Sequence, residues 1–181
     1  HEDFLESYEM AAQLGFSNLN VDLMLGIPGQ TLQSYLETLR MVTHLPCKPA
    51  HISAYSLIVE DGTRMADRVQ RGAAIVPDDD TVNEMQRMAV RMLAARGFER
   101  YEISNFAQIG YESRHNLNYW LGGEYLGLGS AAHSLLNNER FANPPQIDRY
   151  IAGERRLNRE IRTENDCMEE MIMLQTRTVR G

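Results

Sequence analysis

The sequence has few cysteines and no long apolar run. Its 181 residues include only two cysteines, Cys47 and Cys167. They lie far apart and form no disulfide framework, which indicates a reducing compartment and predicts a cytoplasmic protein. No apolar run approaches the ~20 residues that a membrane span requires, and no signal peptide precedes the first helical pattern. We therefore expect a soluble protein without a membrane span.

Positive charge is also scarce. Lys and Arg number 18 against 25 Asp and Glu, which gives a formal net charge of −7. A nucleic-acid binder gains most of its affinity by neutralising phosphates with basic residues. The balance of charge therefore argues against nucleic acid as a partner.

Helical and strand patterns alternate in the first half of the chain. Apolar residues recur at helical spacing over 3–14 and 32–43, and strand patterns cover 18–25 and 51–58. Short connections between helix and strand imply right-handed crossovers and a parallel sheet. The sequence thus predicts an α/β fold.

Further elements follow in the same way. We expect a short helix over 63–70, a long helix from Asp78 through 96, a strand over 98–104, and helices over 144–150 and 164–175. The acidic run 78–80 is the start of a helix rather than a metal site, because carboxylates cap the free amides there. Thr163 and Asp166 have the spacing of a capping box.

The segment 101–134 stands apart from these patterns. It holds the only Trp, two of the five His residues and many glycines, without a helical period. Such a mixture is suited to lining a cavity for a flat, partly polar ligand. A long, well-packed loop is the alternative.

Asp22 interrupts an apolar strand. Val21, Leu23 and Leu25 point to one face, so Asp22 shares the other face with Asn20 and Met24. An unpaired carboxylate there would cost several kcal/mol. Ligand hydroxyl or ammonium groups would compensate it, and a structural salt bridge is the alternative.

The next predicted strand repeats this arrangement. Ser53 and Tyr55 alternate with Ile52 and Ala54, so a second polar face can converge on the same interior. Ser56, near the strand end, can offer backbone atoms to a ligand. Polar groups at the carboxyl ends of parallel strands are where ligands bind in such sheets.

Two stretches of the sequence carry histidines that could ligate a metal. His44, Cys47 and His51 have spacings that a zinc site could use, but two prolines separate them and a fourth ligand is missing, so we predict no metal site. In the run HNLNYW, His115 can ligate iron, and Tyr119 or Trp120 can stack on a tetrapyrrole. The alternative is a loop anchored by a buried Trp and a hydrogen-bonded His.

The motifs NVDLMLGIPGQT, HISAYSL, YEISNFA, RHNLNYW and YLGLGSAAHS together resemble the oxygen-independent coproporphyrinogen III oxidase family of radical S-adenosylmethionine proteins. The match is closest to the family's heme chaperone branch. The resemblance implies the second half of a partial (β/α)6 TIM-like barrel, plus an α+β extension. It divides the chain into barrel units over 1–100, a porphyrin-associated segment over 101–153, and the start of a helical domain over 154–181.

The resemblance also implies the site residues. By position in the motifs, Asp22, Ser56 and His133 are similar to S-adenosylmethionine contacts. The motif HNLNYW points to heme or porphyrin binding by His115, Asn116, Tyr119 and Trp120. Two positions depart from the family: Ala131 stands where a Gly is common and Ser113 where a Cys is frequent.

The family's [4Fe-4S] cluster is held by a Cys-x3-Cys-x2-Cys loop that this chain does not contain. We therefore expect the chain to be part of a longer protein, with no catalytic residue for radical chemistry of its own.

For the intact protein, the resemblance implies a chaperone that binds heme and delivers it to an acceptor protein. The alternative is oxidative decarboxylation of coproporphyrinogen III to protoporphyrinogen IX. A third possibility is a half-barrel that binds nothing. A half-barrel leaves a strand edge unpaired, which predicts self-association.

Overall fold

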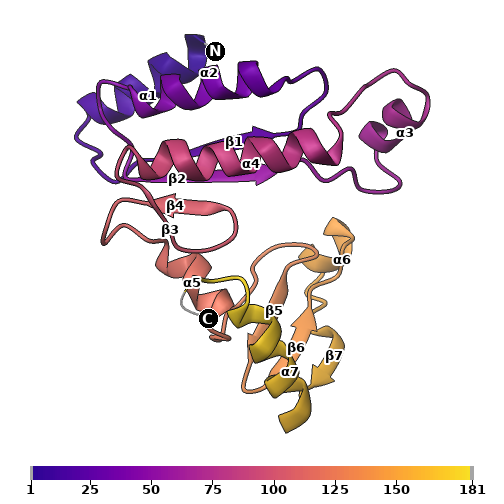
Figure 1. The fold of residues 1–181 in the computed structure, drawn as a ribbon. Helices are drawn as coiled ribbons and strands as arrows, with labels where there is room; N and C mark the ends of the chain where they lie inside the picture. The colour runs from indigo at the N-terminus through magenta and orange to yellow at the C-terminus, as the bar shows by residue number, and fades with distance from the viewer. Residues whose placement is uncertain (1, 180–181) are drawn as a thin grey trace. The chain divides into compact units, whose positions relative to one another are not determined.

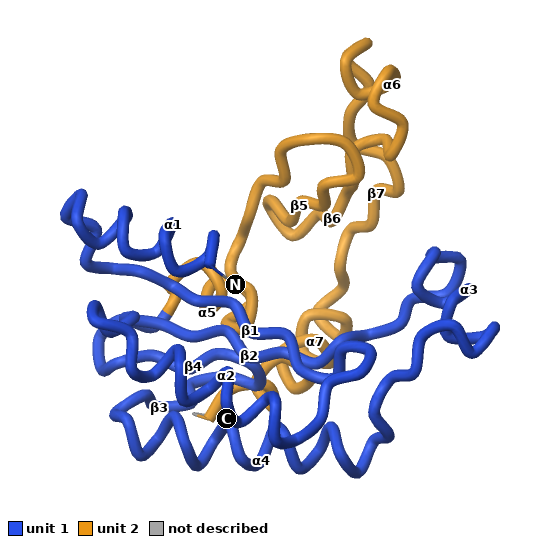
Figure 2. Tube along the Cα trace, turned by 90° about the horizontal axis from the view of Figure 1, so that it is seen from above, with its two compact units in different colours: residues 1–112 blue, residues 113–181 orange. Residues whose placement is uncertain are grey.

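The computed structural model describes residues 2–179 of the chain. It divides into two compact units, residues 1–112 and 113–181, coloured blue and orange in Figure 2. The division falls inside the predicted segment 101–153. None of the helices in the described part of the chain is long and apolar enough to cross a membrane.

The first unit is an α/β fold in which helices pack on a four-stranded sheet (Figure 1). Its elements are α1 (Glu2–Gln13), β1 (Asn20–Leu25), α2 (Leu32–Thr43), β2 (His51–Ser56), α3 (Arg64–Gln70), α4 (Asp79–Ala94), β3 (Glu99–Arg100) and β4 (Asn105–Ala107). The predicted order of helices and strands through α4 is confirmed.

The sheet has the strand order β1-β2-β4-β3. Strands β1 and β2 are parallel, with Asn20 beside His51 and Asp22 beside Ser53. Strand β4 runs antiparallel to both β2 and β3. The prediction of a parallel sheet is therefore right for the first pair of strands and wrong for the last.

The strand predicted over 98–104 is also wrong in extent. Only Glu99 and Arg100 form β3, and the chain then turns back to pair as β4. The Arg100 guanidinium donates to the Ile103 carbonyl at 2.7 Å within this turn. Alternation of side chains continues through a tight turn, so it does not reveal where the strand ends.

Helices α1, α2 and α4 all pack on one face of the sheet. The core joins side chains of β1, β2 and β4 to side chains of these helices. Its members include Tyr8, Val21, Leu23, Leu25, Tyr35, Leu39, Ile52, Met85, Leu93 and Phe106. Within the described residues of the first unit, no helix packs on the face that carries Asn20 and Asp22.

The predicted helix starts are confirmed by their caps. The Asp78 carboxylate accepts the Thr81 amide at 2.8 Å, as expected for a helix start rather than a metal site. Thr63 caps α3, and Thr163 forms a capping box with Asp166 at the start of α7.

The second unit holds a three-stranded antiparallel sheet with the order β5-β6-β7 (Figure 1). Its elements are α5 (Arg114–Trp120), β5 (His133–Leu136), β6 (Glu139–Ala142), α6 (Ile147–Ile151), β7 (Leu157–Ile161) and α7 (Glu164–Gln175). The alternative of one long loop over 101–134 is wrong, because α5 lies within that segment. Its two turns are too short to show a period.

Candidate functional site

The uncovered face of the first sheet carries the predicted polar residues. Along β1, buried and exposed residues alternate strictly, with Val21, Leu23 and Leu25 buried. Asp22 lies on the exposed face, and its neighbour across the sheet is Ser53 of β2. The two polar faces predicted from the sequence thus form one surface.

A chain of hydrogen bonds crosses this surface. The Asn20 side-chain amide donates to Asp22 Oδ1 at 2.6 Å. The Asn20 Oδ1 lies 2.6 Å from His51 Nδ1, and His51 Nε2 lies 2.7 Å from the Tyr101 hydroxyl. Within the described residues, Asp22 is therefore compensated by an amide and not by the salt bridge that was the alternative.

His51 is the buried member of this chain, with 5% of its surface exposed. Burial lowers the pKa of His51 because the charged imidazolium loses solvation, and the nearby Asp22 carboxylate partly opposes that shift. His51 is thus held neutral at neutral pH. The sequence does not reveal Asn20, His51 and Tyr101 as a group, because their hydrogen bonds join residues 31 and 50 positions apart.

Two further residues border the same surface. Ser56 is the last residue of β2 and lies beside Leu25 at the carboxyl end of β1. Asn105 of β4 lies beside Ser53 and is 9% exposed. Its Oδ1 has no hydrogen-bond partner within residues 2–179.

The predicted heme residues lie on α5 in the second unit. Ser113, at the position where the family often has Cys, accepts the Asn116 amide at 3.2 Å and caps this helix. His115 is exposed, and its Nε2 lies 3.2 Å from the Tyr119 hydroxyl one helical turn later. The two rings meet edge to face with centroids 4.9 Å apart.

Trp120 is half-buried at the end of α5. The guanidinium of Arg177 lies over its ring, 5.3 Å from the centroid. The indole Nε1 is buried and has no hydrogen-bond partner in the described part of the chain. The structural alternative to heme binding was a segment anchored by a buried Trp and a hydrogen-bonded His. Both features are present, and both are compatible with heme binding.

A cavity of about 350 Å³ lies beside Tyr119. Its lining includes Tyr125, whose ring meets that of Tyr119 edge to face at 4.8 Å, together with Met173 and Leu174 of α7. Arg140 and Arg162 reach the same cavity and both bind Glu170. The second unit thus contains an aromatic and aliphatic cavity with charged groups in its wall.

His133 begins β5 and is exposed. Its backbone carbonyl closely approaches Gly127, where a Cβ atom would lie only 2.1 Å from that oxygen. Gly127 therefore allows the preceding segment to pack against β5. His133 and Asp22 belong to different units, so a joint contact with one ligand stays a prediction.

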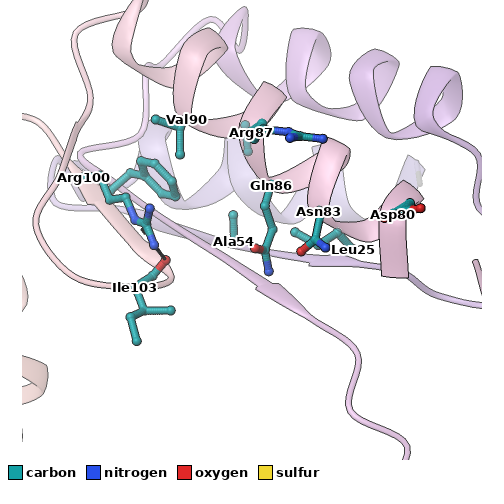
Figure 3. A pocket seen from close by; sticks show the side chains of 11 residues that line it. Leu25, Ala54, Asp80, Asn83, Gln86, Arg87, Val90, Arg100 and Ile103 are labelled. Carbon is teal, nitrogen blue, oxygen red and sulfur yellow. Dashed lines mark hydrogen bonds between the residues drawn. The ribbon is translucent and has the colours of Figure 1, made fainter. Parts of the chain in front are cut away.

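A separate cavity of about 360 Å³ opens beside α4 in the first unit (Figure 3). Its floor includes Leu25, Ala54 and Phe106, which belong to the helix-covered face of the sheet. Asn83 and Gln86 of α4 line it. This cavity lies on the face opposite to Asp22.

The cysteines do not form a cluster site. Cys47 and Cys167 are both free and belong to different units. Within residues 2–179 no group of three or more His, Cys, Asp or Glu side chains is arranged to hold a metal ion. The donors present do not fit a [4Fe-4S] cluster.

Sequence comparison gives several curated relatives. The chain is 37% identical over 178 residues to the heme chaperone HemW of Bacillus subtilis, covering 95% of the chain and 46% of the relative. The chain is homologous to the HemW heme chaperones. The HemW of Escherichia coli is 38% identical over 125 residues, covering 69% of the chain and 32% of that protein. The family resemblance predicted from the motifs is thereby confirmed.

A relative with a different name is also similar over most of the chain. The mitochondrial radical S-adenosyl methionine domain-containing protein 1 of Bos taurus is 40% identical over 131 residues, covering 72% of the chain and 29% of that protein. The chain therefore spans about half, or less, of the length of these curated relatives. No protein-family model matches the sequence.

Comparison of structures supports the fold. Coproporphyrinogen III oxidase (HemN) from Escherichia coli, described as a radical SAM enzyme, matches with a TM-score of 0.76 at 20% identity. The match covers 95% of the chain and 43% of that protein. The predicted fold class, α/β with part of the radical SAM fold, is confirmed.

Proposed function

We propose that this chain is the heme-binding part of a HemW-like chaperone that delivers heme to an acceptor protein. The observation that carries the proposal is the similarity to HemW heme chaperones over nearly the whole chain. The exposed His115 on α5, beside an aromatic cavity, supports it.

The chemistry of α5 fits an iron porphyrin. If His115 Nε2–H donates to the Tyr119 oxygen, Nδ1 keeps its lone pair for iron, and the phenol fixes the orientation of the ring. The rings of Tyr119 and Trp120 can stack on the macrocycle, and Asn116 lies on the same short helix. The residues present are therefore of the kinds that hold heme.

S-adenosylmethionine is the second ligand that we propose, with Asp22, Ser56 and His133 as contacts. The Asp22 carboxylate is exposed on the uncovered face of the sheet, where it can accept hydrogen bonds from ribose hydroxyls or an ammonium group. The parallel strands β1 and β2 end at the same edge, which is where ligands bind in open α/β sheets.

The second candidate is decarboxylation of coproporphyrinogen III, favoured by the structural match to coproporphyrinogen III oxidase. To separate the two, the longer protein with a reconstituted cluster is given coproporphyrinogen III anaerobically. In parallel, heme-loaded protein is mixed with an apo-cytochrome. The chaperone proposal predicts transfer of heme to the apo-protein and no protoporphyrinogen. Formation of protoporphyrinogen would contradict a role as chaperone alone.

The scarcity of cysteine supports a reducing setting for this proposal. Within this proposal the protein works in the cytoplasm, where its two free cysteines stay reduced. Its partners are heme and a heme-acceptor protein.

A further inference from the structure

The uncovered face of the first sheet holds a hydrogen-bond chain that ends on Asp22. It begins at the Tyr101 hydroxyl, passes through the buried imidazole of His51 and the side-chain amide of Asn20, and reaches the carboxylate. Each contact is 2.6 to 2.7 Å long. Ser53 also donates to Asn20 Oδ1, more weakly, at 3.4 Å.

The direction of this chain follows from its charged end. The Asp22 carboxylate can only accept, so the Asn20 amide presents its Nδ2 donor to Asp22 and its Oδ1 acceptor to His51. His51 must then carry its proton on Nδ1. The neutral ring leaves Nε2 as an acceptor, and the Tyr101 hydroxyl donates to it.

Asp22 is held at one oxygen only. Oδ1 accepts from Asn20, while Oδ2 has no hydrogen-bond partner within residues 2–179 and the side chain is exposed. A carboxylate fixed in this way presents its second oxygen in a defined direction. The chemistry that suits it is a ligand that donates hydrogen bonds, such as the hydroxyls of a ribose.

We propose that Asn20 and His51 are positioning residues that orient Asp22 toward such a ligand. The proposal rests on the proposed function in naming S-adenosylmethionine as the ligand. Holding the carboxylate before binding lowers the entropy lost when the ligand arrives. A buried histidine with a purely structural role would stabilise the fold but would leave the affinity of Asp22 for its ligand unchanged.

The first test needs no ligand. Nitrogen-15 NMR of the His51 imidazole gives its tautomer and pKa in the chain, in Asp22→Asn, and in Asp61→Asn as an exposed control. The direction of the hydrogen bonds predicts that His51 carries its proton on Nδ1. It also predicts a lower pKa of His51 in Asp22→Asn, because the carboxylate that favours the imidazolium is gone. Tyr101 and Asp22 are the titratable groups that face the ring.

An unchanged pKa of His51 in Asp22→Asn, or the Nε2–H tautomer, would overturn the proposal. Asp61→Asn should leave the pKa of His51 where it is. The same comparison detects a misfolded variant, since the remaining histidine signals would then move as well.

The second test measures S-adenosylmethionine by titration calorimetry. Asn20→Ala and His51→Leu should each raise the dissociation constant about tenfold. The first substitution removes the hydrogen bond to the carboxylate, and the second removes the bond that orients the Asn20 amide. His51→Gln should retain the affinity, since its amide can donate toward Asn20 and accept from Tyr101. Equal affinities in folded His51→Leu and in the unchanged chain would contradict positioning.

The two tests distinguish a wrong ligand from a wrong role for Asn20 and His51. If S-adenosylmethionine does not bind the chain or its variants, the proposed ligand of Asp22 is wrong. The NMR comparison still decides whether Asn20 and His51 are coupled to the carboxylate.

Discussion

Ala131 has a backbone conformation that alanine rarely adopts. Its φ of 58° lies in the left-handed region, in the turn that leads from Gly129 into β5. The amide of Ala131 donates to the Pro144 carbonyl at 3.1 Å, so the surrounding structure fixes this turn. The conformation gives a physical reason for the Gly that the family often has at this position.

Ala131→Gly should therefore stabilise the protein. The left-handed conformation costs alanine about 1–2 kcal/mol, and glycine adds roughly 0.4–1 kcal/mol of chain entropy to the unfolded state. We expect a net gain of about 0.5–1 kcal/mol in the free energy of unfolding, measured by urea denaturation. Ala132→Gly is the matched control and should destabilise. A loss of stability in both variants would show that the turn does not strain Ala131.

Only part of the candidate site around Asp22 could be predicted from the sequence; the rest is apparent only from contacts in the structure. Asp22 could be predicted because a carboxylate inside an apolar strand is unusual. Asn20 and His51 could not, because their hydrogen bond depends on the register of β1 against β2, which the sequence of either strand does not give. The strand alternation predicts the face of a side chain but not its neighbour across the sheet.

At the scale of elements, an ion-pair cluster fixes α7 against the second sheet. Glu170 of α7 accepts from Arg140 of β6 at 2.6 Å and from Arg162 at 2.9 Å. Burial alone would raise the pKa of Glu170, but the hydrogen bonds from the two guanidinium groups hold it below its usual value. The side chain is 21% exposed, so the cluster is partly shielded from solvent.

Glu170→Gln should destabilise the second unit by about 1–2 kcal/mol near neutral pH, because two charge-assisted hydrogen bonds weaken. A lowered pKa in the folded state gives stability that is complete above the unfolded pKa near 4.5 and is lost as the pH falls through the folded value. The difference between the two proteins should therefore shrink on acidification. Urea denaturation between about pH 3 and pH 7 measures it.

Glu169→Gln removes the neighbouring exposed carboxylate and serves as the control. It should have little effect on stability at any pH. If Glu170→Gln differed from the unchanged chain by the same amount at pH 3 and pH 7, the carboxylate would not be the source of the stabilisation.

Most elements could be predicted from the sequence because their patterns are long. The helices α2 and α4 run for 12 and 16 residues and have clear caps. The seven-residue α5 and the two-residue β3 could not, because neither is long enough to show a period. The antiparallel return of β4 depends on the turn that Arg100 closes through its bonds to the Ile103 carbonyl.

At the scale of the whole molecule, β1 is an edge strand. It pairs with β2 on one side and with no strand on the other within residues 2–179. Unpaired amides and carbonyls at such an edge can pair with a second copy of the chain. The predicted self-association follows from this edge.

Light scattering of the isolated chain should therefore give a mass above that of a monomer at high concentration. Met24→Lys places a charge on the exposed face of β1 and should reduce association. Met10→Lys, on the exposed side of α1, is the control and should not. A monomeric mass for the unchanged chain at every concentration would count against the edge as an interface.

The most direct test of heme binding is an absorbance titration of the chain with heme. His115→Ala is compared with His44→Ala, which removes an exposed histidine of the first unit. The unchanged chain and His44→Ala should show a Soret shift that saturates at about one equivalent. His115→Ala should lose the shift. Equal saturation in His115→Ala, or no shift in any of the three proteins, would contradict heme binding at α5.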